Sequence, residues 1–162
     1  MGLYSYNVLP ITLCDYLINL YETDVGNHER VDKQSKPTFT QLNLNKYHAN
    51  VVSNLCNYFS VALDFYKKDV PQAKYLPQVK YLEEFRIKKY AVGGQDRFDE
   101  HVDVVNHQSS RRCLAMLFYL NNIDSGGKTI FPFQNKEFTP KRGNVIIFPP
   151  VSYTHLTLPT KA

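Results

Sequence analysis

The chain has 162 residues, which is enough for one domain with a substantial hydrophobic core. Hydrophobic residues make up 43% of it and aromatic residues 14%, a composition that excludes an intrinsically disordered protein. The net charge of +4 is mild and spread along the chain, so we expect no nucleic-acid partner, and no apolar run is long enough to cross a membrane. Three widely separated cysteines and the absence of a signal-peptide pattern predict a cytoplasmic location.

Residues 1–80 are expected to form a mainly helical support region. Apolar residues recur at helical spacing in residues 11–21, where Thr12 is a candidate N-cap. Residues 24–37 are polar and predict a loop. The strongest helical pattern covers residues 47–68 and stops shortly before Pro71, which cannot continue a helix.

Residues 81–162 predict short strands separated by turns. The strand candidates are residues 84–91, 101–105, 113–120, 128–131 and 144–148. The run CLAMLFYL at 113–120 is apolar on both faces, which predicts a buried central strand. Short strands at this spacing predict a fold of the α+β class that is mainly β, a sandwich or jelly roll with flanking helices near the N-terminus.

The pattern His101-Val102-Asp103 is the candidate site. A His and an Asp two positions apart on a strand have side chains on the same face. A second His from a distant strand, with His155 as the candidate, would complete a 2-His-1-carboxylate triad. Such a triad binds iron(II) on one face and leaves open positions for chemistry.

The order of motifs around this pattern is more specific than any one of them. From Tyr90 the chain reads YAVGGQDRFDEHVDV, RRCLAMLFYLNN, SGGKTIFPF and TPKRGNVIIFPP. This order resembles the iron(II)- and 2-oxoglutarate-dependent dioxygenases of the prolyl 4-hydroxylase type, including small bacterial and phage-encoded members. The resemblance covers about residues 84–150, nearly half of the chain.

The resemblance implies a double-stranded β-helix in residues 81–162, within a single domain of residues 1–162. It implies that His101 and Asp103 are the first two iron(II) ligands and that Tyr90 helps to hold 2-oxoglutarate, although a purely structural core Tyr would look the same. The implied reaction consumes O2 and 2-oxoglutarate, with ascorbate as reductant, and releases succinate and CO2. It hydroxylates an unactivated carbon, first of all in a prolyl residue of a peptide or protein, with small molecules as other substrates.

Four further residues are expected to have structural or solvated roles. Thr129 and Phe131 belong to the GGxTxF element, where the glycines allow a tight turn and Phe131 packs. Arg112 is interpreted as a residue that orders a loop or forms an ion pair. His107 lies in a polar loop and is expected to be solvated.

The end of the chain departs from the family pattern. After FPP the sequence reads VSYTHLTLPTKA, in which His155 is the candidate distal iron ligand and Lys161 a candidate cation for 2-oxoglutarate. Lys161 comes earlier than the family spacing allows, and the last strand is expected to be missing, as in a truncated chain. Two interpretations of residues 151–162 stay open: a native tail that supplies these groups, or a non-native tail that imitates them.

Two alternatives to the oxygenase remain. One is a non-catalytic jelly-roll binding module with an incomplete metal site. The other is a cupin-like metal protein, although cupins more often combine HxH with a Glu, and HVD does not match. Iron binding with 2-oxoglutarate turnover separates the oxygenase from both, because a jelly roll alone hosts many functions. The sequence does not indicate whether the chain forms oligomers.

Overall fold

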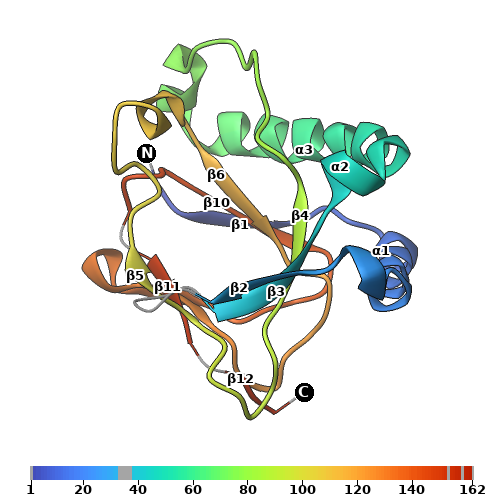
Figure 1. The fold of residues 1–162 in the computed structure, drawn as a ribbon. Coiled ribbons are helices and arrows are strands. Elements are labelled where there is room, and N and C mark those ends of the chain that lie inside the picture. Colours follow the sequence, from blue (N-terminus) through green and yellow to red (C-terminus); the bar gives the residue numbers. More distant parts are fainter. Residues whose placement is uncertain (1, 33–37, 153, 158, 162) are drawn as a thin grey trace.

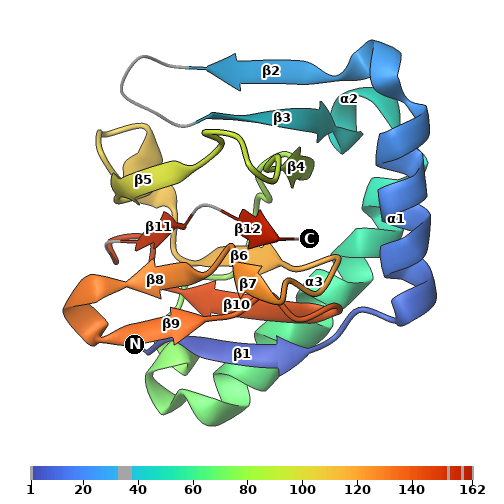
Figure 2. The same ribbon diagram turned by 90° about the horizontal axis from the view of Figure 1, so that it is seen from below.

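Two antiparallel β-sheets that face each other form the centre of the fold (Figures 1 and 2). The structure is a computed structural model that describes residues 2–32, 38–152, 154–157 and 159–161. Residues 159–161 are described by their backbone alone. The first sheet has the order β1-β10-β6 and consists of β1 (Tyr4–Asn7), β10 (Asn144–Phe148) and β6 (Ala115–Phe118). The second has the order β5-β11-β8-β9 and consists of β5 (Phe98–His101), β11 (Thr154–Leu156), β8 (Thr129–Phe131) and β9 (Lys136–Phe138).

Two further sheets and three α-helices of the described residues surround this centre. One sheet has three strands: β2 (Glu29–Asp32), β3 (Thr38–Asn43) and β4 (Arg86–Lys89). The other pairs β12 (Pro159–Lys161) with β7 (Ser125–Gly126). The α-helices are α1 (Ile11–Thr23), α2 (Leu44–Tyr47) and α3 (Ala49–Asp69). Short 3₁₀ turns cover Val25–Asn27, Pro71–Tyr75, Ser109–Arg111 and Pro132–Gln134. None of the helices in the described part of the chain is long and apolar enough to span a bilayer.

Strand β10 is buried on both faces and organises the core. On one face Val145 and Ile147 pack against Tyr66 of α3, which lies across the outside of the first sheet (Figure 1). On the other face Ile146 contacts the cluster that includes Phe131 of the second sheet. This alternation follows from the two-residue period of a strand, and it makes β10 the layer between helix and second sheet.

The sheet of β2, β3 and β4 connects the two halves of the sequence. Leu42 of β3 and Ile87 of β4 are register partners and pack with Leu17 and Tyr21 of α1. The opposite face of β3 and β4 therefore turns away from α1, and it carries Phe39 and Lys88.

The helices agree closely with the sequence prediction. Helix α1 covers the predicted residues 11–21, but its N-cap is Pro10, so the predicted cap at Thr12 is wrong. Helix α3 ends at Asp69 and a 3₁₀ turn begins at Pro71, as predicted.

The strands differ from the sequence prediction in four places. Residues 113–120 were predicted to form a central strand, but β6 is at the edge of its sheet and β10 is in the middle. Residues 24–37 were predicted as a loop, but β2 occupies Glu29–Asp32, and residues 33–37 are not among the described ones. The predicted strand 101–105 is displaced, since β5 ends at His101. Residues 1–80 also contribute the strands β1, β2 and β3, which an isolated helical pattern did not indicate.

An ion pair between half-exposed Arg30 and buried Asp96 joins β2 to the turn before β5 and predicts a pH dependence of stability. Arg30 donates two hydrogen bonds to Asp96, at 2.7 and 3.1 Å, and the Ala91 amide donates a third at 3.0 Å. Hydrogen bonding from Arg30 holds the pKa of Asp96 below its usual value. The stabilisation is therefore complete above the unfolded pKa of about 3.9 and is lost as pH falls through the lower folded pKa.

We expect Asp96→Asn to lower the free energy of unfolding by about 1–2 kcal/mol at pH 7, because a charged hydrogen-bond acceptor is removed while Arg30 stays half exposed. Urea unfolding at pH 7 and pH 3 measures the free energy of unfolding. The difference in this free energy between Asp96→Asn and the unmodified chain should shrink at pH 3. Asp64→Asn, on an exposed face of α3, is the control that should change neither value. An equal loss at both pH values would contradict the assignment.

Candidate active site

His101 and Asp103 lie side by side at the end of β5. His101 Nε2 is 3.2 Å from Asp103 Oδ1, and both side chains are about one quarter exposed. Two ligands at right angles, each about 2.1 Å from one ion, are about 3 Å apart. The spacing of this nitrogen and this oxygen therefore fits two adjacent positions around one metal ion.

The hydrogen bonding of His101 selects its tautomer. Nδ1 lies 2.8 Å from the carbonyl oxygen of Asp99, which can only accept, so Nδ1 carries the proton. In the neutral imidazole, Nε2 then has a free lone pair on the side of Asp103. The His101 ring also stacks on Phe98, with centroids 3.8 Å apart, which fixes its plane. Such outer contacts are what orient a metal-binding imidazole.

Backbone contacts hold Asp103, because it lies beyond the end of the strand. Its amide donates to the carbonyl of Pro150 at 2.9 Å, and its own carbonyl accepts from Arg112 Nη1. Arg112 also donates from Nε to Glu83 at 2.6 Å. The interpretation of Arg112 as a loop-ordering residue is therefore confirmed, and the loop it orders is the one that carries a candidate ligand.

His155 lies on the adjacent strand β11, but its side chain does not face His101 and Asp103. Thr154 is the register partner of His101, and His155 is the partner of Ile130 in β8. Successive strand residues alternate faces, so His155 lies on the opposite face, where its Nδ1 is 3.8 Å from Glu100. Among the residues that the structure describes, no group of three or more His, Cys, Asp or Glu is placed to hold a metal ion.

Tyr90 lies just after β4 in a position that suits ligand binding. Its hydroxyl is buried and has no hydrogen-bond partner within the described residues, and burial raises its pKa above the usual value. A buried hydroxyl without a partner is costly, so a bound acceptor would remove that cost. Lys161, the other predicted contact, has a side chain outside the described residues.

The other predicted residues have the expected surroundings. Phe131 is fully buried, and Thr129 accepts a 2.7 Å hydrogen bond from Tyr119, whose pKa burial raises to about 12. Gly126 and Gly127 have φ angles of 74° and 63°, which favour glycine and allow the turn before β8. His107 is exposed, as predicted.

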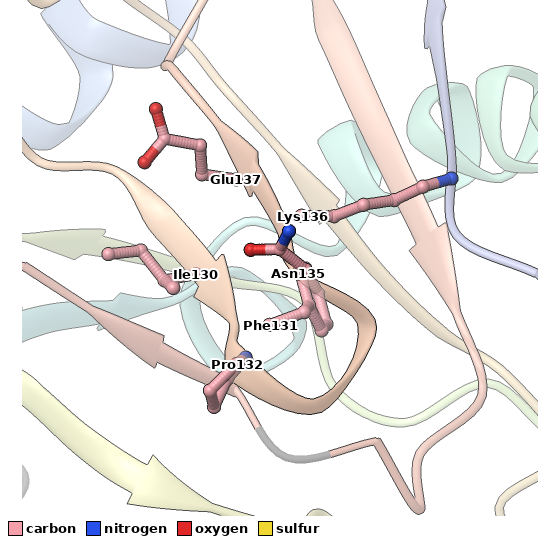
Figure 3. A pocket seen from close by; sticks show the side chains of 6 residues that line it. All are labelled: Ile130, Phe131, Pro132, Asn135, Lys136 and Glu137. Atoms are coloured by element: carbon pink, nitrogen blue, oxygen red, sulfur yellow. The ribbon is translucent and has the colours of Figure 1, made fainter.

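Two hollows lie near these elements. A hollow of about 300 Å³ borders the loop after Asp103 and is lined by Glu83, Val105, Asn106, Gln108, Ser109 and Arg112. Figure 3 shows another, of about 150 Å³, in the hairpin of β8 and β9, lined by Ile130, Phe131, Pro132, Asn135, Lys136 and Glu137. Neither hollow is lined by His101 or Asp103. The hollow of about 300 Å³ adjoins the loop that carries Asp103.

His101 and Asp103 are placed to supply two of the three metal ligands that the sequence predicted. A neutral imidazole nitrogen and a carboxylate oxygen are donors suited to iron(II), and the carbonyl of Asp99 and the guanidinium of Arg112 hold them in place. The third predicted donor, His155, has its backbone on the neighbouring strand.

Sequence reasoning missed the aromatic surroundings of the pair. Phe98 and Phe39 lie between β4 and His101, and Lys88 lies against both rings. The alternation in RIKKY could have indicated Lys88, since it shares a strand face with Tyr90.

Comparison with known proteins shows which families this sequence and fold resemble. Residues 85–162 match the family model of the 2OG-Fe(II) oxygenase superfamily. The structure superimposes on a viral collagen prolyl hydroxylase from Paramecium bursaria Chlorella virus-1, solved as a 2OG complex, with a TM-score of 0.68 and 19% identity over 100% of this chain and 90% of that one. It also superimposes on a Pseudomonas putida prolyl-4-hydroxylase with a TM-score of 0.66 and 19% identity over 99% and 87%.

A curated plant protein, "Probable prolyl 4-hydroxylase 9" of Arabidopsis thaliana, is 38% identical over 79 residues, which are 46% of this chain and 26% of that protein. The chain spans well under half the length of the curated relatives it matches. Residues 85–162 are therefore similar to the 2OG-Fe(II) oxygenase superfamily, and the relatives named here are prolyl hydroxylases. The resemblance predicted from the motif order is confirmed.

Proposed function

We propose that this chain is an Fe(II)- and 2-oxoglutarate-dependent oxygenase of the prolyl 4-hydroxylase type. The observation that carries the proposal is the spacing of His101 Nε2 and Asp103 Oδ1, 3.2 Å, with Nδ1 of His101 committed to a backbone carbonyl. The name of the plant relative and the titles of the two solved structures support the substrate class, a prolyl residue of a peptide or protein.

In this proposal His101 and Asp103 supply two iron(II) ligands. His155, on β11 beside β5, supplies the third, for which its side chain would have to turn from the face of Glu100 to the face of the pair. We also propose that the two central sheets are the walls of a double-stranded β-helix within a single domain, which residues 1–80 brace with α1 and α3. All three cysteines are free, which supports a reducing compartment.

The chain's own groups would divide the work as follows. Iron, 2-oxoglutarate and O2, with ascorbate as reductant, supply the oxidation, which releases succinate and CO2 and hydroxylates an unactivated carbon. His101 keeps its proton on Nδ1 and presents Nε2, and Arg112 holds the Asp103 loop. The Tyr90 hydroxyl donates to a cosubstrate oxygen. The hollow beside Val105 and Asn106 would receive part of the peptide.

Succinate production from 2-oxoglutarate tests the proposal without knowledge of the substrate. The anaerobically purified chain is given iron(II), ascorbate and 2-oxoglutarate, and O2 is then admitted. We expect succinate that a chelator abolishes. Loss of succinate in His155→Ala would mean that this side chain turns to the pair to bind iron. Retained turnover in His155→Ala would exclude this residue as a ligand while leaving the oxygenase intact.

The second candidate is a non-catalytic jelly-roll binding module. The observation that favours it is that no three-residue metal cluster forms among the described residues. Failure of the unmodified chain to bind Mn(II), measured by electron paramagnetic resonance, together with no succinate, would support this candidate and overturn the first.

A further inference from the structure

Residues 77–82 form an exposed stretch between the 3₁₀ turn of Pro71–Tyr75 and strand β4 (Figure 1). Within the part of the chain that the structure describes, no hydrogen bond or ion pair involves any residue of this stretch. Leu76, directly before it, has φ −60° and ψ 141°, which is the polyproline II conformation. The stretch is therefore available to another surface in the extended form in which peptides are commonly recognised.

The side chains of this segment are unusually apolar for a position in solvent. Tyr81 is 89% exposed and Tyr75, at the end of the 3₁₀ turn, is 78% exposed, while Val79 and Leu82 are exposed as well. Single apolar residues on a surface need no explanation, but several within one short segment indicate contact with another molecule. Tyrosine in particular is enriched at protein interfaces. The segment therefore has the character of a peptide ligand.

Pro77 differs from the other exposed prolines of the described residues, which are Pro10, Pro71 and Pro132. Pro10 caps α1, and its carbonyl accepts from the amide of Leu13. Pro71 and Pro132 each begin a 3₁₀ turn. These local structures must open before their prolines can enter a site on another molecule, whereas Pro77 can enter without the loss of a hydrogen bond. Pro77 is therefore the exposed proline best placed for modification.

The receiving surface is the hollow of about 300 Å³ beside the loop that carries Asp103. Its lining combines the exposed side chain of Val105 with polar groups that include those of Asn106 and Gln108. Polar groups can bind the main chain of an extended peptide, and an apolar side chain can contact its Pro, Val or Leu residues. The hollow thus offers residues 77–82 of a second copy a place next to the metal-binding loop.

The chain's own stretch is held at both ends and runs away from β5, as Figure 1 shows (green, at the top). One end is fixed at Glu83, which lines the hollow and accepts a hydrogen bond from Arg112 Nε at 2.6 Å. The other end is fixed at Leu76, whose amide donates to the carbonyl of Ala73 at 3.1 Å, and Ala73 is buried in the cluster that contains Tyr66 of α3. A second copy can therefore supply Pro77 more readily than the chain itself.

We propose that Pro77 of one copy is hydroxylated at the active site of a second copy of this chain. The inference rests on the proposed function, and it names the chain as one of its own substrates. In this reaction one oxygen atom of O2 enters a ring C–H bond of Pro77 and the other enters succinate, while 2-oxoglutarate loses CO2. O2 is reduced, and the proline carbon and 2-oxoglutarate are oxidised, so no further reactant is needed.

Transfer of heavy oxygen between two distinguishable copies tests the assignment. The acceptor is His101→Ala, labelled with heavy nitrogen, and it is mixed with the active chain, iron(II), ascorbate, 2-oxoglutarate and isotopically heavy O2. Trypsin cuts after Lys74 and Lys80, so the peptide between them contains Pro77 as its single proline. We expect tandem mass spectrometry to find heavy oxygen on Pro77 of the acceptor, at least about tenfold more than on Pro71, whose turn must first open.

Two matched variants of the acceptor complete the test. Pro77→Ala in the acceptor should abolish the heavy oxygen in this peptide, and Pro71→Ala should leave the labelling of Pro77 within about twofold. Succinate without heavy oxygen on Pro77 of either copy would overturn the inference while the proposed function stands. Heavy oxygen on Pro77 of the active copy alone would overturn the assignment to a second copy. Absence of iron-dependent succinate would instead overturn the proposed function, and this inference with it.

Discussion

His101→Ala and Asp103→Ala should each lower iron-dependent succinate formation by at least about 100-fold. Each removes one of two groups placed 3.2 Å apart for one ion, and metal assistance contributes several kcal/mol, at about 1.4 kcal/mol per factor of ten. The expected change in folding stability is small, because both side chains are partly exposed at the end of β5. The measurements are succinate from 2-oxoglutarate and the thermal unfolding midpoint of each variant.

The control for this experiment lies in the same loop. His107→Ala replaces an exposed histidine four residues beyond Asp103 and should leave turnover unchanged. Retained activity in His101→Ala or Asp103→Ala would remove the metal-site assignment, and an equal loss in His107→Ala would indicate a general effect of the loop.

The sequence predicted the pair but not the way in which the structure holds it. Alternation along a strand was the reason to expect His101 and Asp103 together, yet β5 ends at His101. Their proximity comes from contacts outside the strand instead, with Pro150 and Arg112 holding Asp103 by its backbone. Periodicity reports local geometry only, so the contact between Asp103 and Pro150, which are far apart in the sequence, is beyond its reach.

The same limit explains the strands that were missed. Strand β1 pairs with β10 across more than a hundred residues, and its sequence YSYN has no distinctive pattern. Strands β3 and β4 pair across the whole of α3, which places Phe39 beside Lys88 and Tyr90. Helices were predicted better because their hydrogen bonds are local and their apolar stripe is visible within one segment.

The motif order succeeded where periodicity did not, because it specifies an arrangement and not an element. The GGxTxF element illustrates the difference: Thr129 and Phe131 were read as structural, and both are buried where the two sheets meet. A motif that fixes the core of a fold also fixes the position of its site, because β8 pairs with β11 and β11 pairs with β5.

Of the variants considered, Phe131→Ala should therefore lower the free energy of unfolding the most. The ring is completely buried and packs edge-on against Phe138 at 5.9 Å and Phe148 at 4.9 Å. Loss of a buried Phe side chain costs about 3–5 kcal/mol through lost burial and the cavity that remains. In a chain of this size that corresponds to a fall in the unfolding midpoint of roughly 6–20 °C, which calorimetry or thermal circular dichroism measures.

Phe133→Ala removes the same side chain two residues further on, where the ring is 76% exposed, and it should cost less than about 1 kcal/mol. A comparable loss in both variants would mean that Phe131 is not the contact joining the sheets. If only Phe131→Ala is destabilised, metal binding should weaken with it. Phe131 anchors β8 to the first sheet, and β8 reaches His101 through β11, so the second sheet would lose the support that places His101 beside Asp103.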